Sequence, residues 1–579
     1  MSRKQNRRQF LITAGASAVA GSGAFPTSAR AAPPFFKLYL MIPNNQPARM
    51  AWGTLAANQM IKLGIDVVSS FVPFSAILPR RSKGDGATHV NGGWDAYLER
   101  YYYNAITPVP NNLFRSTALP PSGQNFYYLN DPQIDAALDD YAQAHDEAAR
   151  MAAIRRFEKR WYDTQPMTIL FYPKDVIAMN PKLNGYEATT FNPVFFPNPE
   201  DWTIEGAGND ASAAFASWEP PTNLLPMYSS GYNESNIFGP VYNRLLEYDS
   251  WKNKKLVPAL AESVVSSEGD KHWVIKLRQG VAWHSGEEFT ASDVKFTWDT
   301  ILDKAYASPY QASFARIFGS NDAYQVTGKH EITVSLPAYT MEFISWVLPA
   351  MQIMPAHAYK DIRPEAMRGH VANTFRGSFT VNTSDGKSYT ASGGIGTGPW
   401  VAVGFDPARK AYKFVKNLRY WKTTTGNVTT FYIVNIQGTD SVLSALKAGE
   451  IDAHDPMYDI GSLVSTIDAS WGKVSTYDSF KWQHICYNLR HPIIGTGIET
   501  PLGKDDPSRA AEAAAYIRQA ISFATPRDQI VKEIAGGYGE PGTVPMAFTA
   551  PEYDHATLKP IRYDMDLARQ YMEKAGYRY

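Results

Sequence analysis

The sequence predicts an α/β protein, because short apolar strands alternate with amphipathic helices along most of the chain. Residues 35–42 form an aromatic and apolar run that predicts a buried strand. A helix is expected over 47–63, where Gly64 ends it, and a second strand starts at Ile65. Because the connections in this strand–helix–strand unit are short, a parallel sheet is favoured.

The next segment adds a loop and one long helix before the pattern changes. Residues 80–93 are rich in glycine and charge and predict a loop. Residues 131–161 predict one amphipathic helix, and 167–172 predict a strand. Residues 180–209 then carry several prolines, asparagines and glycines, which is typical of an extended connection without a core of its own.

Beyond this connection the alternation of strands and helices starts again. One expected helix begins after Thr290, a residue type that caps helix N-termini well. Residues 378–392 are polar and predict a loop. No repeat with a period of about 20–50 residues is found, which argues against solenoids and propellers. The expected elements are strands over 213–218, 273–277, 333–336, 412–415 and 431–436, and helices over 236–246, 290–301, 440–448, 510–523 and 564–574.

The composition narrows the classes of function. Hydrophobic residues make up 44% and charged residues 19% of the 579 positions, which excludes an intrinsically disordered chain. Lys and Arg number 56, as do Asp and Glu, so the net charge is zero and no general attraction to nucleic acid is expected. Aromatic residues reach 13%, which fits either large cores or an aromatic ligand cleft. The single cysteine, Cys486, excludes an intramolecular disulfide.

Residues 1–31 predict an export signal. A basic start that includes Arg7 and Arg8 precedes an apolar stretch too short to span a bilayer as a helix. The arginine pair resembles a twin-arginine signal, with an ordinary secretory signal as the alternative. Small residues at 29 and 31 predict cleavage before Ala32. We therefore expect an exported, periplasmic protein.

The sequence offers no enzyme motif. It contains no GxxxxGK[ST] phosphate loop, no HExxH and no GxSxG. Residues 394–398 are glycine-rich, but Pro399 follows at once and prevents a helix from starting there to receive a phosphate. His484 and His491 flank Cys486 and resemble a metal site, although lone histidines near a strand are usually structural. We expect a binding protein without a catalytic residue, cofactor or metal.

Several long motifs resemble a known family. KLVPALAES over 255–263, WVIKLRQGV over 273–281, WHSGE over 283–287 and FTASDV over 289–294 stand in close succession. GTGP over 396–399, NLRYW over 417–421, LKAGEID over 446–452 and IRQAI over 517–521 follow in order. Together they resemble the family 5 extracellular solute-binding proteins of ABC transporters, the peptide, nickel and opine class.

The resemblance implies a particular α/β architecture. It is the two-lobed periplasmic-binding-protein fold (type II, similar to cluster C), with an extra subdomain in the first lobe and a hinge that closes the lobes on a ligand. The family's last third, however, resembles the residues that come first in this chain. The resemblance therefore implies a circularly permuted order, in which Phe35 and Tyr579 are spatial neighbours. A wrongly joined gene model is the alternative.

The expected division follows from this permuted order. Residues 1–31 are the export signal, 35–165 and 481–579 form the second lobe, and 166–480 form the first lobe. The first lobe includes the extra subdomain over about 250–390 and the connection over 180–209.

The resemblance also implies where a ligand is held, because a closing cleft needs flat apolar walls and a few fixed polar groups. The candidates are Trp218, Glu219, Asn223, Tyr228, Thr397 and Gly398 from the first lobe, Trp482, Tyr487 and Asn488 at the crossing, and Trp94, Asp95, Tyr97, Tyr101 and Tyr102 from the second lobe.

The identity of the solute stays open. Peptide-binding members of the family place an aspartate before a tyrosine to pair with the peptide amino terminus, whereas this chain has Glu99 and Arg100 before its tyrosines. A peptide or amino-acid derivative is favoured by the family, and an oligosaccharide or an opine-like compound is the alternative. A monomer that serves an inner-membrane ABC permease is expected, with a ligand sensor or a periplasmic enzyme on the same scaffold as rivals.

Overall fold

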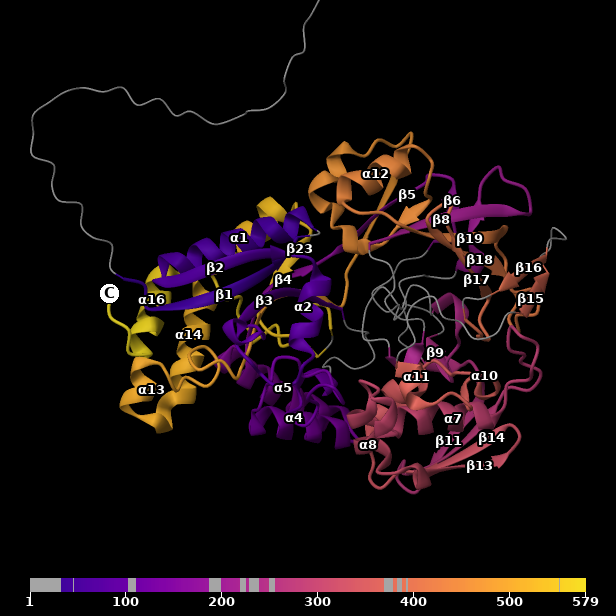
Figure 1. The fold of residues 1–579 in the computed structure, drawn as a ribbon, viewed down its shortest axis with the longest axis horizontal. Helices are drawn as coiled ribbons and strands as arrows, with labels where there is room; N and C mark the ends of the chain where they lie inside the picture. Colours follow the sequence, from indigo (N-terminus) through magenta and orange to yellow (C-terminus); the bar gives the residue numbers. More distant parts are fainter. Residues whose placement is uncertain are drawn as a thin grey trace, which may run out of the picture.

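The computed structural model shows two α/β lobes side by side (Figure 1). The lobe that carries the C-terminus is called lobe II and the other lobe I. A smaller sheet lies below lobe I. The structure describes residues 33–44, 46–102, 111–186, 199–218, 225–228, 239–248, 256–368, 379–382, 388–391, 394–550 and 552–579.

Lobe II is built on a mixed sheet whose described strands run in the order β2-β1-β3-β22-β4-β23. The first three are parallel, and β22 pairs antiparallel with both β3 and β4. The predicted strand–helix–strand unit is confirmed, because β1 and β2 pair in parallel over eight residues around helix α1. The strands are β1 (Phe36–Pro43), β2 (Ile65–Val72), β3 (Ala96–Tyr102), β4 (Met167–Pro173), β22 (Lys481–Tyr487) and β23 (Gly539–Pro541).

Helices cover both faces of this sheet. On one face α1 (Pro47–Lys62), α14 (Ala510–Ala524) and α16 (Met565–Lys574) bury an aliphatic core around Leu38, Trp52 and Ile517. On the other face α4 (Pro132–Gln143) and α5 (Glu147–Thr164) bury an aromatic core around Trp94 and Trp161. Lobe II also contains α2 (Phe74–Arg81), η1 (His89–Asn91), α3 (Asn111–Phe114), α13 (Pro501–Asp505), η9 (Pro507–Arg509), α15 (Arg527–Gln529) and η10 (Ile530–Ile534).

Lobe I is built on a second mixed sheet, with its described strands in the order β17-β18-β19-β8-β20-β5-β21. Helix α12 (Thr439–Lys447) and the turns η7 (Pro456–Tyr458) and η8 (Ile460–Thr466) pack on one face. The strands are β5 (Asp175–Met179), β8 (Ala211–Ser217), β17 (Trp400–Asp406), β18 (Ala411–Lys416), β19 (Val428–Asn435), β20 (Ala453–His454) and β21 (Lys473–Tyr477).

The smaller sheet lies within residues 261–335 and is antiparallel, in the order β11-β12-β14-β13. Helix α7 (Ala291–Leu302) starts as predicted, with Thr290 and Asp293 forming a capping box. The strands of this sheet are β11 (Ala261–Ser267), β12 (His272–Leu277), β13 (Tyr324–Gly328) and β14 (Glu331–Ser335). The other elements of this part are β9 (Leu246–Tyr248), β10 (Leu256–Pro258), η4 (Lys304–Tyr306), α8 (Gln311–Phe318), η5 (Asn321–Ala323), η6 (Phe343–Val347), α9 (Leu348–Ala350), α10 (Ala356–Tyr359) and α11 (Pro364–Arg368). The paired strands β15 (Phe379–Asn382) and β16 (Ser388–Ala391) lie beside β17 of lobe I instead (Figure 1).

Two strands carry the chain from one lobe to the other. Strand β4 of lobe II continues through Lys174 into β5 of lobe I, and β21 of lobe I continues into β22 of lobe II. The expected start of lobe I at residue 166 is therefore wrong, because β4 pairs with β22 and β23 inside the lobe II sheet. An apolar run predicts a strand but not its partner, and this partner lies more than 300 residues away (Thr168 bonds Tyr487 across 319 positions).

Three other local predictions need correction. The expected helix over 131–161 is two helices, because Asp146 accepts a bond from the Ala149 backbone N–H and caps a new helix. Residues 242–245 are not helical, and the chain continues into β9, which pairs with β10. Within 378–392 the described residues form the β15–β16 hairpin rather than a loop.

The beginning and the end of the described chain meet on lobe II. The ring centroids of Phe35 and Tyr579 lie 5.1 Å apart, and the Tyr579 hydroxyl donates to the Leu63 carbonyl at 3.0 Å. The predicted proximity of Phe35 and Tyr579 is therefore confirmed. In the connection over 180–209, Trp202 and Leu183 are buried in the lobe I core, so its described residues are more than a surface link.

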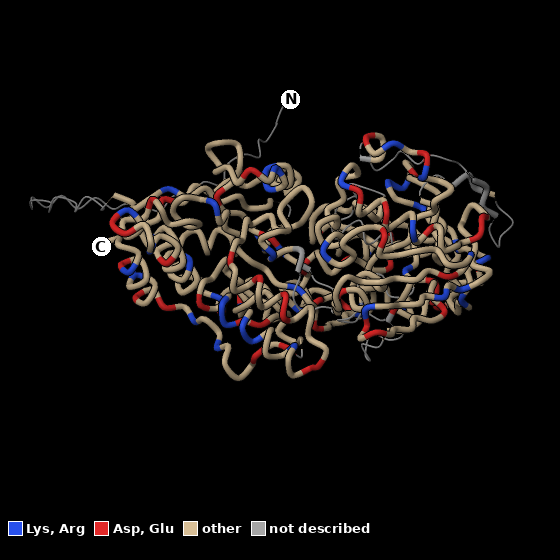
Figure 2. The backbone as a smooth tube through the Cα atoms, turned by 90° about the horizontal axis from the view of Figure 1, so that it is seen from below, with Lys and Arg blue, Asp and Glu red and all other residues tan. Residues whose placement is uncertain are grey.

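Charged residues of both signs are interspersed along both halves of the molecule (Figure 2). Over the described residues, no helix combines the length and the apolar character that crossing a membrane requires.

Candidate ligand-binding region between the lobes

Three of the candidates from lobe II belong to its aromatic core. Trp94 and Tyr97 are fully buried and pack edge to face, with ring centroids 4.8 Å apart. The buried Asp95 carboxylate accepts from the backbone N–H groups of Tyr39 at 3.2 Å and His89 at 2.7 Å. These contacts fix the loop before β3, and they leave the two rings no surface to offer a ligand in this conformation.

Tyr487 and Asn488, expected at the crossing, also serve the interior of lobe II. The Tyr487 hydroxyl shares a 2.7 Å hydrogen bond with Thr168. The Asn488 amide donates to the carbonyl oxygens of Gly86, Ala87 and Trp94 at 2.8–3.1 Å. Asn488 thereby closes the loop over 86–94 onto the sheet.

In lobe I the GTGP loop is held by the WHSG motif. The His284 backbone N–H donates to the Gly396 carbonyl at 2.8 Å, its Nδ1 accepts from the Gly396 N–H at 3.2 Å, and its Nε2 lies 3.0 Å from the Gly398 carbonyl. Burial lowers the pKa of His284 to about 4, so a neutral ring holds the loop. The Thr397 hydroxyl donates to Asn243 at 3.2 Å. Both site candidates of this loop, Thr397 and Gly398, are thus engaged in internal contacts.

The remaining candidates differ in how far they are buried. Half-buried Tyr101 packs against buried Trp482 with ring centroids 5.2 Å apart. Trp218 is buried and packs against Tyr458, with ring centroids 5.1 Å apart. Tyr228 is half-buried and packs against the core of the smaller sheet. Only the backbone of Tyr102 is described, and Glu219 and Asn223 lie outside the described residues.

A buried charged network lies between Tyr97 and Tyr101 on the same face of β3. Glu99 forms an ion pair with Arg81 and accepts from the hydroxyls of Tyr97 at 3.2 Å and Tyr127 at 3.0 Å. The Arg81 guanidinium and these hydroxyls hold the pKa of Glu99 below its ordinary value despite burial.

His484 and Cys486 join this network from the neighbouring strand. Their ligand atoms lie within 4.8 Å of the Glu99 carboxylate and of each other, a spacing that suits a metal ion. Arg81 and the two tyrosines already use both carboxylate oxygens, and the Arg81 cation opposes a second positive charge. His491, the other candidate ligand, accepts instead from the Ile493 N–H at 3.1 Å.

Arg100, the next residue of β3, points the other way and connects the lobes. Its guanidinium forms an ion pair with Asp459 of lobe I and donates to the Met457 carbonyl at 3.4 Å. With its amide turned to accept, Gln483 takes two bonds of 2.8 Å from Arg100. Gln46, just before α1, donates to the same Met457 carbonyl. Lobe II therefore holds the turn over 456–459 of lobe I through polar contacts. Lobe II also bonds to the part around the smaller sheet, where the Ala312 N–H donates to the Ser122 carbonyl at 3.0 Å and the Tyr339 hydroxyl donates to the Ala144 carbonyl at 3.4 Å.

Backbone contacts and a second ion pair reinforce this junction. A Cβ on Gly461 of lobe I would stand 2.7 Å from the Ala535 carbonyl oxygen, and one on Gly536 would stand 2.8 Å from the Gly461 backbone. The lobes thus approach to a distance that only glycine permits. Between the crossing strands, Lys481 and Asp175 form an ion pair with both side chains about 1% exposed.

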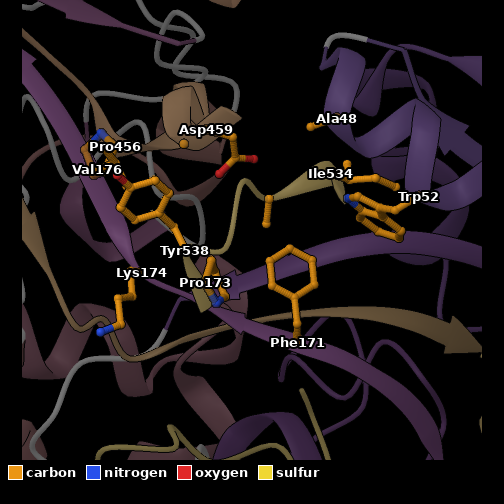
Figure 3. A pocket seen from close by; sticks show the side chains of 12 residues that line it. Ala48, Trp52, Phe171, Pro173, Lys174, Val176, Pro456, Asp459, Ile534 and Tyr538 are labelled. Carbon is orange, nitrogen blue, oxygen red and sulfur yellow. The ribbon is translucent and has the colours of Figure 1, made fainter. Parts of the chain in front are cut away.

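A small pocket opens beside this junction and takes its walls from both lobes. Figure 3 shows the rings of Trp52, Phe171 and Tyr538 around it and the Asp459 carboxylate pointing toward its centre. Trp52 and Phe171 belong to the aliphatic core of lobe II, whereas Tyr101 and Trp482 pack with the aromatic core on the opposite face of the sheet. The pocket and the Tyr101–Trp482 pair therefore lie on different faces.

None of the pocket residues was predicted from the sequence. Trp52 stands in an ordinary amphipathic helix, Phe171 in an apolar strand, and Asp459 in a short turn. Asp459 has a φ of 50°, which is uncommon for a residue other than glycine, but the sequence does not reveal this backbone angle.

The lobes, the two crossing strands and the contacts between them define a two-domain binding-protein architecture. Within that class, residues 255–579 match the model of the bacterial extracellular solute-binding proteins, family 5 (middle region). The matched region is more than half of the chain, and the protein belongs to this family.

The most similar relatives include proteins named for different solutes. The chain is 24% identical over 386 residues to di/tripeptide-binding protein 3 of Pseudomonas aeruginosa, covering 63% of this chain and 64% of the relative. It is 23% identical over 361 residues to the nickel-binding periplasmic protein of Escherichia coli, covering 62% and 60%. The chain thus spans less than two thirds of the length of these relatives.

Among solved structures, the oligopeptide-binding protein AppA from Bacillus subtilis, in complex with a nonapeptide, matches at 18% identity with a TM-score of 0.47. The match covers 64% of this chain and 65% of that structure.

Proposed function

We propose that this protein is a periplasmic solute-binding protein that captures a small organic solute between its lobes and delivers it to an ABC transporter permease. The observation that carries the proposal is the pair of crossing strands between two α/β lobes in a chain of this family. Two strands without other covalent links form a hinge, so a solute that contacts both lobes shifts the population toward the closed form.

A peptide or amino-acid derivative is the favoured solute. Relatives named for dipeptides, tripeptides and oligopeptides support this choice. An oligosaccharide- or opine-binding role, or a sensor that reports ligand status to a membrane partner, is the alternative. A catalytic role is not proposed.

Among the candidate ligand residues, Tyr101 and Trp482 have the best placement, because Tyr101 is half-buried and the pair lies near the crossing. The proposed solute site is completed by Tyr102, Trp218, Tyr228, Glu219 and Asn223. Trp94, Asp95, Tyr97, Thr397, Gly398, Tyr487 and Asn488 support it from behind through the internal contacts described above.

A thermal-shift screen of residues 32–579 tests the proposal. The panel holds di- and tripeptides, amino-acid derivatives, opines, oligosaccharides and nickel chelates. A solute at 100 times its Kd stabilises the fold by about 2.7 kcal/mol, and Tyr101→Ala should remove most of that gain. Phe405→Ala, at an exposed site on lobe I, is the matched control. Stabilisation by no class of solute, in protein shown by mass spectrometry to be ligand-free, contradicts the proposal.

We also propose that the chain order is a permuted form of the family's, with lobe II formed by 35–173 and 481–579 and lobe I by 174–480. The contact between Phe35 and Tyr579 supports this order. A rearranged chain that joins Tyr579 to Phe35 by a short linker and opens within 187–198 should fold and bind the same solute. Failure of that chain to fold speaks against the permutation.

Export by the twin-arginine route and a monomeric state complete the proposal. Replacing both Arg7 and Arg8 with lysine should block export of the full chain, whereas an ordinary secretory signal tolerates the change. Light scattering on the purified protein checks the monomer.

A further inference from the structure

Lobe II is held at a second place, by the part of lobe I around the smaller sheet. Two hydrogen bonds reach it there, from the Ala312 N–H to Ser122 and from the Tyr339 hydroxyl to Ala144. The Tyr339 ring also stacks on His145, with ring centroids 3.7 Å apart and an interplanar angle of 22°. Contacts of two kinds therefore join the same two parts of the molecule.

The start of α8 takes a hydrogen-bond acceptor from the other lobe. The first N–H groups of a helix have no acceptor within that helix, and Ala312 is the second residue of α8. Its acceptor is the Ser122 carbonyl, which belongs to a tight turn of lobe II. The turn is itself fixed, because the Asn125 N–H donates to the Ala118 carbonyl at 2.7 Å. A fixed carbonyl thus satisfies a helix donor across the gap between the lobes.

Residues 337–342 are tied to α8. Arg316 of α8 forms an ion pair with Glu342, and its Nη2 donates to the Glu342 Oε1 at 2.9 Å. Met341, the neighbour of Glu342, is half-buried and packs against the aromatic core of lobe II. The helix and the loop therefore contact lobe II together, as one unit.

This second junction lies on the opposite face of lobe II from the first. Ala144 and His145 are in the loop between α4 and α5, the helices that cover the aromatic face, and α8 lies beside them (Figure 1). Arg100, which bonds to Asp459 in the first junction, points to the other face. Contacts on both faces resist rotation of the lobes about the two crossing strands more than either junction alone.

We propose that α8 and residues 337–342 form a latch that stabilises the closed arrangement of the lobes. Opening of the latch is then a step in the release of a bound solute, and this role rests on the proposed function. The latch itself is tested on protein without solute, so that either proposal can fail while the other stands.

The Ala312 amide reports the latch directly, because a carbonyl of the other lobe protects it. Hydrogen exchange of the solute-free mature chain, resolved to single amides by mass spectrometry with fragmentation, measures its opening. Tyr339→Ala removes a hydrogen bond and a ring stack, so it should speed exchange at Ala312 by about fivefold. The Trp298 amide, inside α7, should keep its rate, because the smaller sheet stays folded.

His145→Ala tests the same contact from lobe II and leaves the smaller sheet unaltered. It should speed exchange at Ala312 by about threefold, and His145→Phe, which keeps a flat ring, should restore most of the protection. Tyr306→Ala is the matched control, because Tyr306 is also a half-buried tyrosine but packs against the core of the smaller sheet. It should leave exchange at Ala312 unchanged.

Two results overturn the latch. One is an unchanged rate at Ala312 in both Tyr339→Ala and His145→Ala. The other is equal acceleration at Trp298 and Ala312, which shows that the smaller sheet unfolds instead of separating from lobe II. Both results leave the proposed transport function intact, because the solute screen decides that function, and a failed screen leaves the exchange rates as evidence for the latch.

Discussion

Glu99 and Arg100 are adjacent in β3 and similarly buried, at 5% and 8% exposed, yet they hold different parts of the molecule together. Glu99 faces the aromatic core and bonds only to groups of its own lobe. Arg100 faces the opposite side and bonds to Asp459 and Met457 of the other lobe. Successive side chains of a strand point to opposite faces of the sheet. Glu99 therefore stabilises lobe II, whereas Arg100 joins lobe II to lobe I.

The difference predicts different responses to substitution. Groups around Glu99 stay buried when it is removed, because they belong to the same core. Asp459, the partner of Arg100, is partly exposed and becomes hydrated when the lobes separate. The free energy of unfolding should therefore depend on Glu99. The distance between the lobes should depend on Arg100 and its partners.

Glu99→Leu should have the largest effect. It leaves the Arg81 guanidinium buried without its carboxylate, which costs about 3–5 kcal/mol of unfolding free energy. Urea unfolding measures the loss. Glu512→Gln, in an exposed pair with Arg509, is the control and should cost less than about 1 kcal/mol. A loss below about 1 kcal/mol for Glu99→Leu shows that Arg81 has another adequate partner.

Acid should destabilise the fold through its buried histidines. Burial lowers the pKa of His484, and likewise of His284 and His454, to about 4, below the ordinary value of 6.5. As pH falls from about 6.5 to 4 the unfolded chain binds protons first, so each group costs up to about 3 kcal/mol of stability across that window.

Urea unfolding at pH 7.5, 5.5 and 4.5 measures this slope. His484→Leu should make it shallower, whereas His145→Asn, at an exposed position, should not change it. An unchanged slope in His484→Leu means that this ring carries a proton in the folded state.

Gly461→Val tests the close approach of the lobes. The added side chain meets the Ala535 carbonyl oxygen and cannot move it without shifting lobe II, so we expect a loss of about 1–3 kcal/mol and a larger separation of the lobes. Spin labels on cysteines introduced at the exposed positions Ile61 and Leu418 report the distance, because the native Cys486 is buried. Gly208→Val, with no atom near its Cβ, should leave the distance unchanged. No change in Gly461→Val indicates that the lobes do not pack at Gly461 in solution.

Asp459→Asn should have the smallest effect on stability and still act on the arrangement of the lobes. Asp459 is partly exposed, and its buried partner Arg100 keeps the Met457 carbonyl and Gln483 as acceptors, so the loss in unfolding free energy should stay below about 1 kcal/mol. The distance distribution between the same two labels should broaden toward longer values. If Asp459→Asn leaves the distance distribution unchanged and Glu99→Leu broadens it, then Glu99, and not the Arg100–Asp459 pair, holds the lobes together.

The fold could be predicted from sequence where local signals were strong. The apolar strands, the glycine after α1 and Thr290 as the residue before α7 act within a few residues, and the structure confirms them. The break between α4 and α5 escaped prediction because no glycine or proline marks it, and Asp146 alone supplies the cap. The sheet to which β4 belongs escaped because its partner strand is distant in sequence.

The candidate site was harder to predict for a physical reason. Trp94 and Tyr97 and the more accessible Tyr101 are the same kind of residue in the same stretch, and only the packing of α4 and α5 decides which are covered. The pocket depends on residues from four separate segments, around 52, 171, 459 and 538, that no local pattern connects. The sequence shows which segments are rich in aromatic residues. Tertiary packing determines which of those rings are exposed to a ligand.

The position of β22 between β3 and β4 has a consequence for folding. Lobe II cannot complete its sheet until a strand made much later arrives, as the Thr168–Tyr487 pair, 319 residues apart, illustrates. During synthesis the edges of β3 and β4 that pair with β22 stay unpaired until all of lobe I is made. Unpaired strand edges promote aggregation. We expect slow refolding, with lobe I acquiring protection from hydrogen exchange before lobe II, and a strong dependence of yield on chaperones.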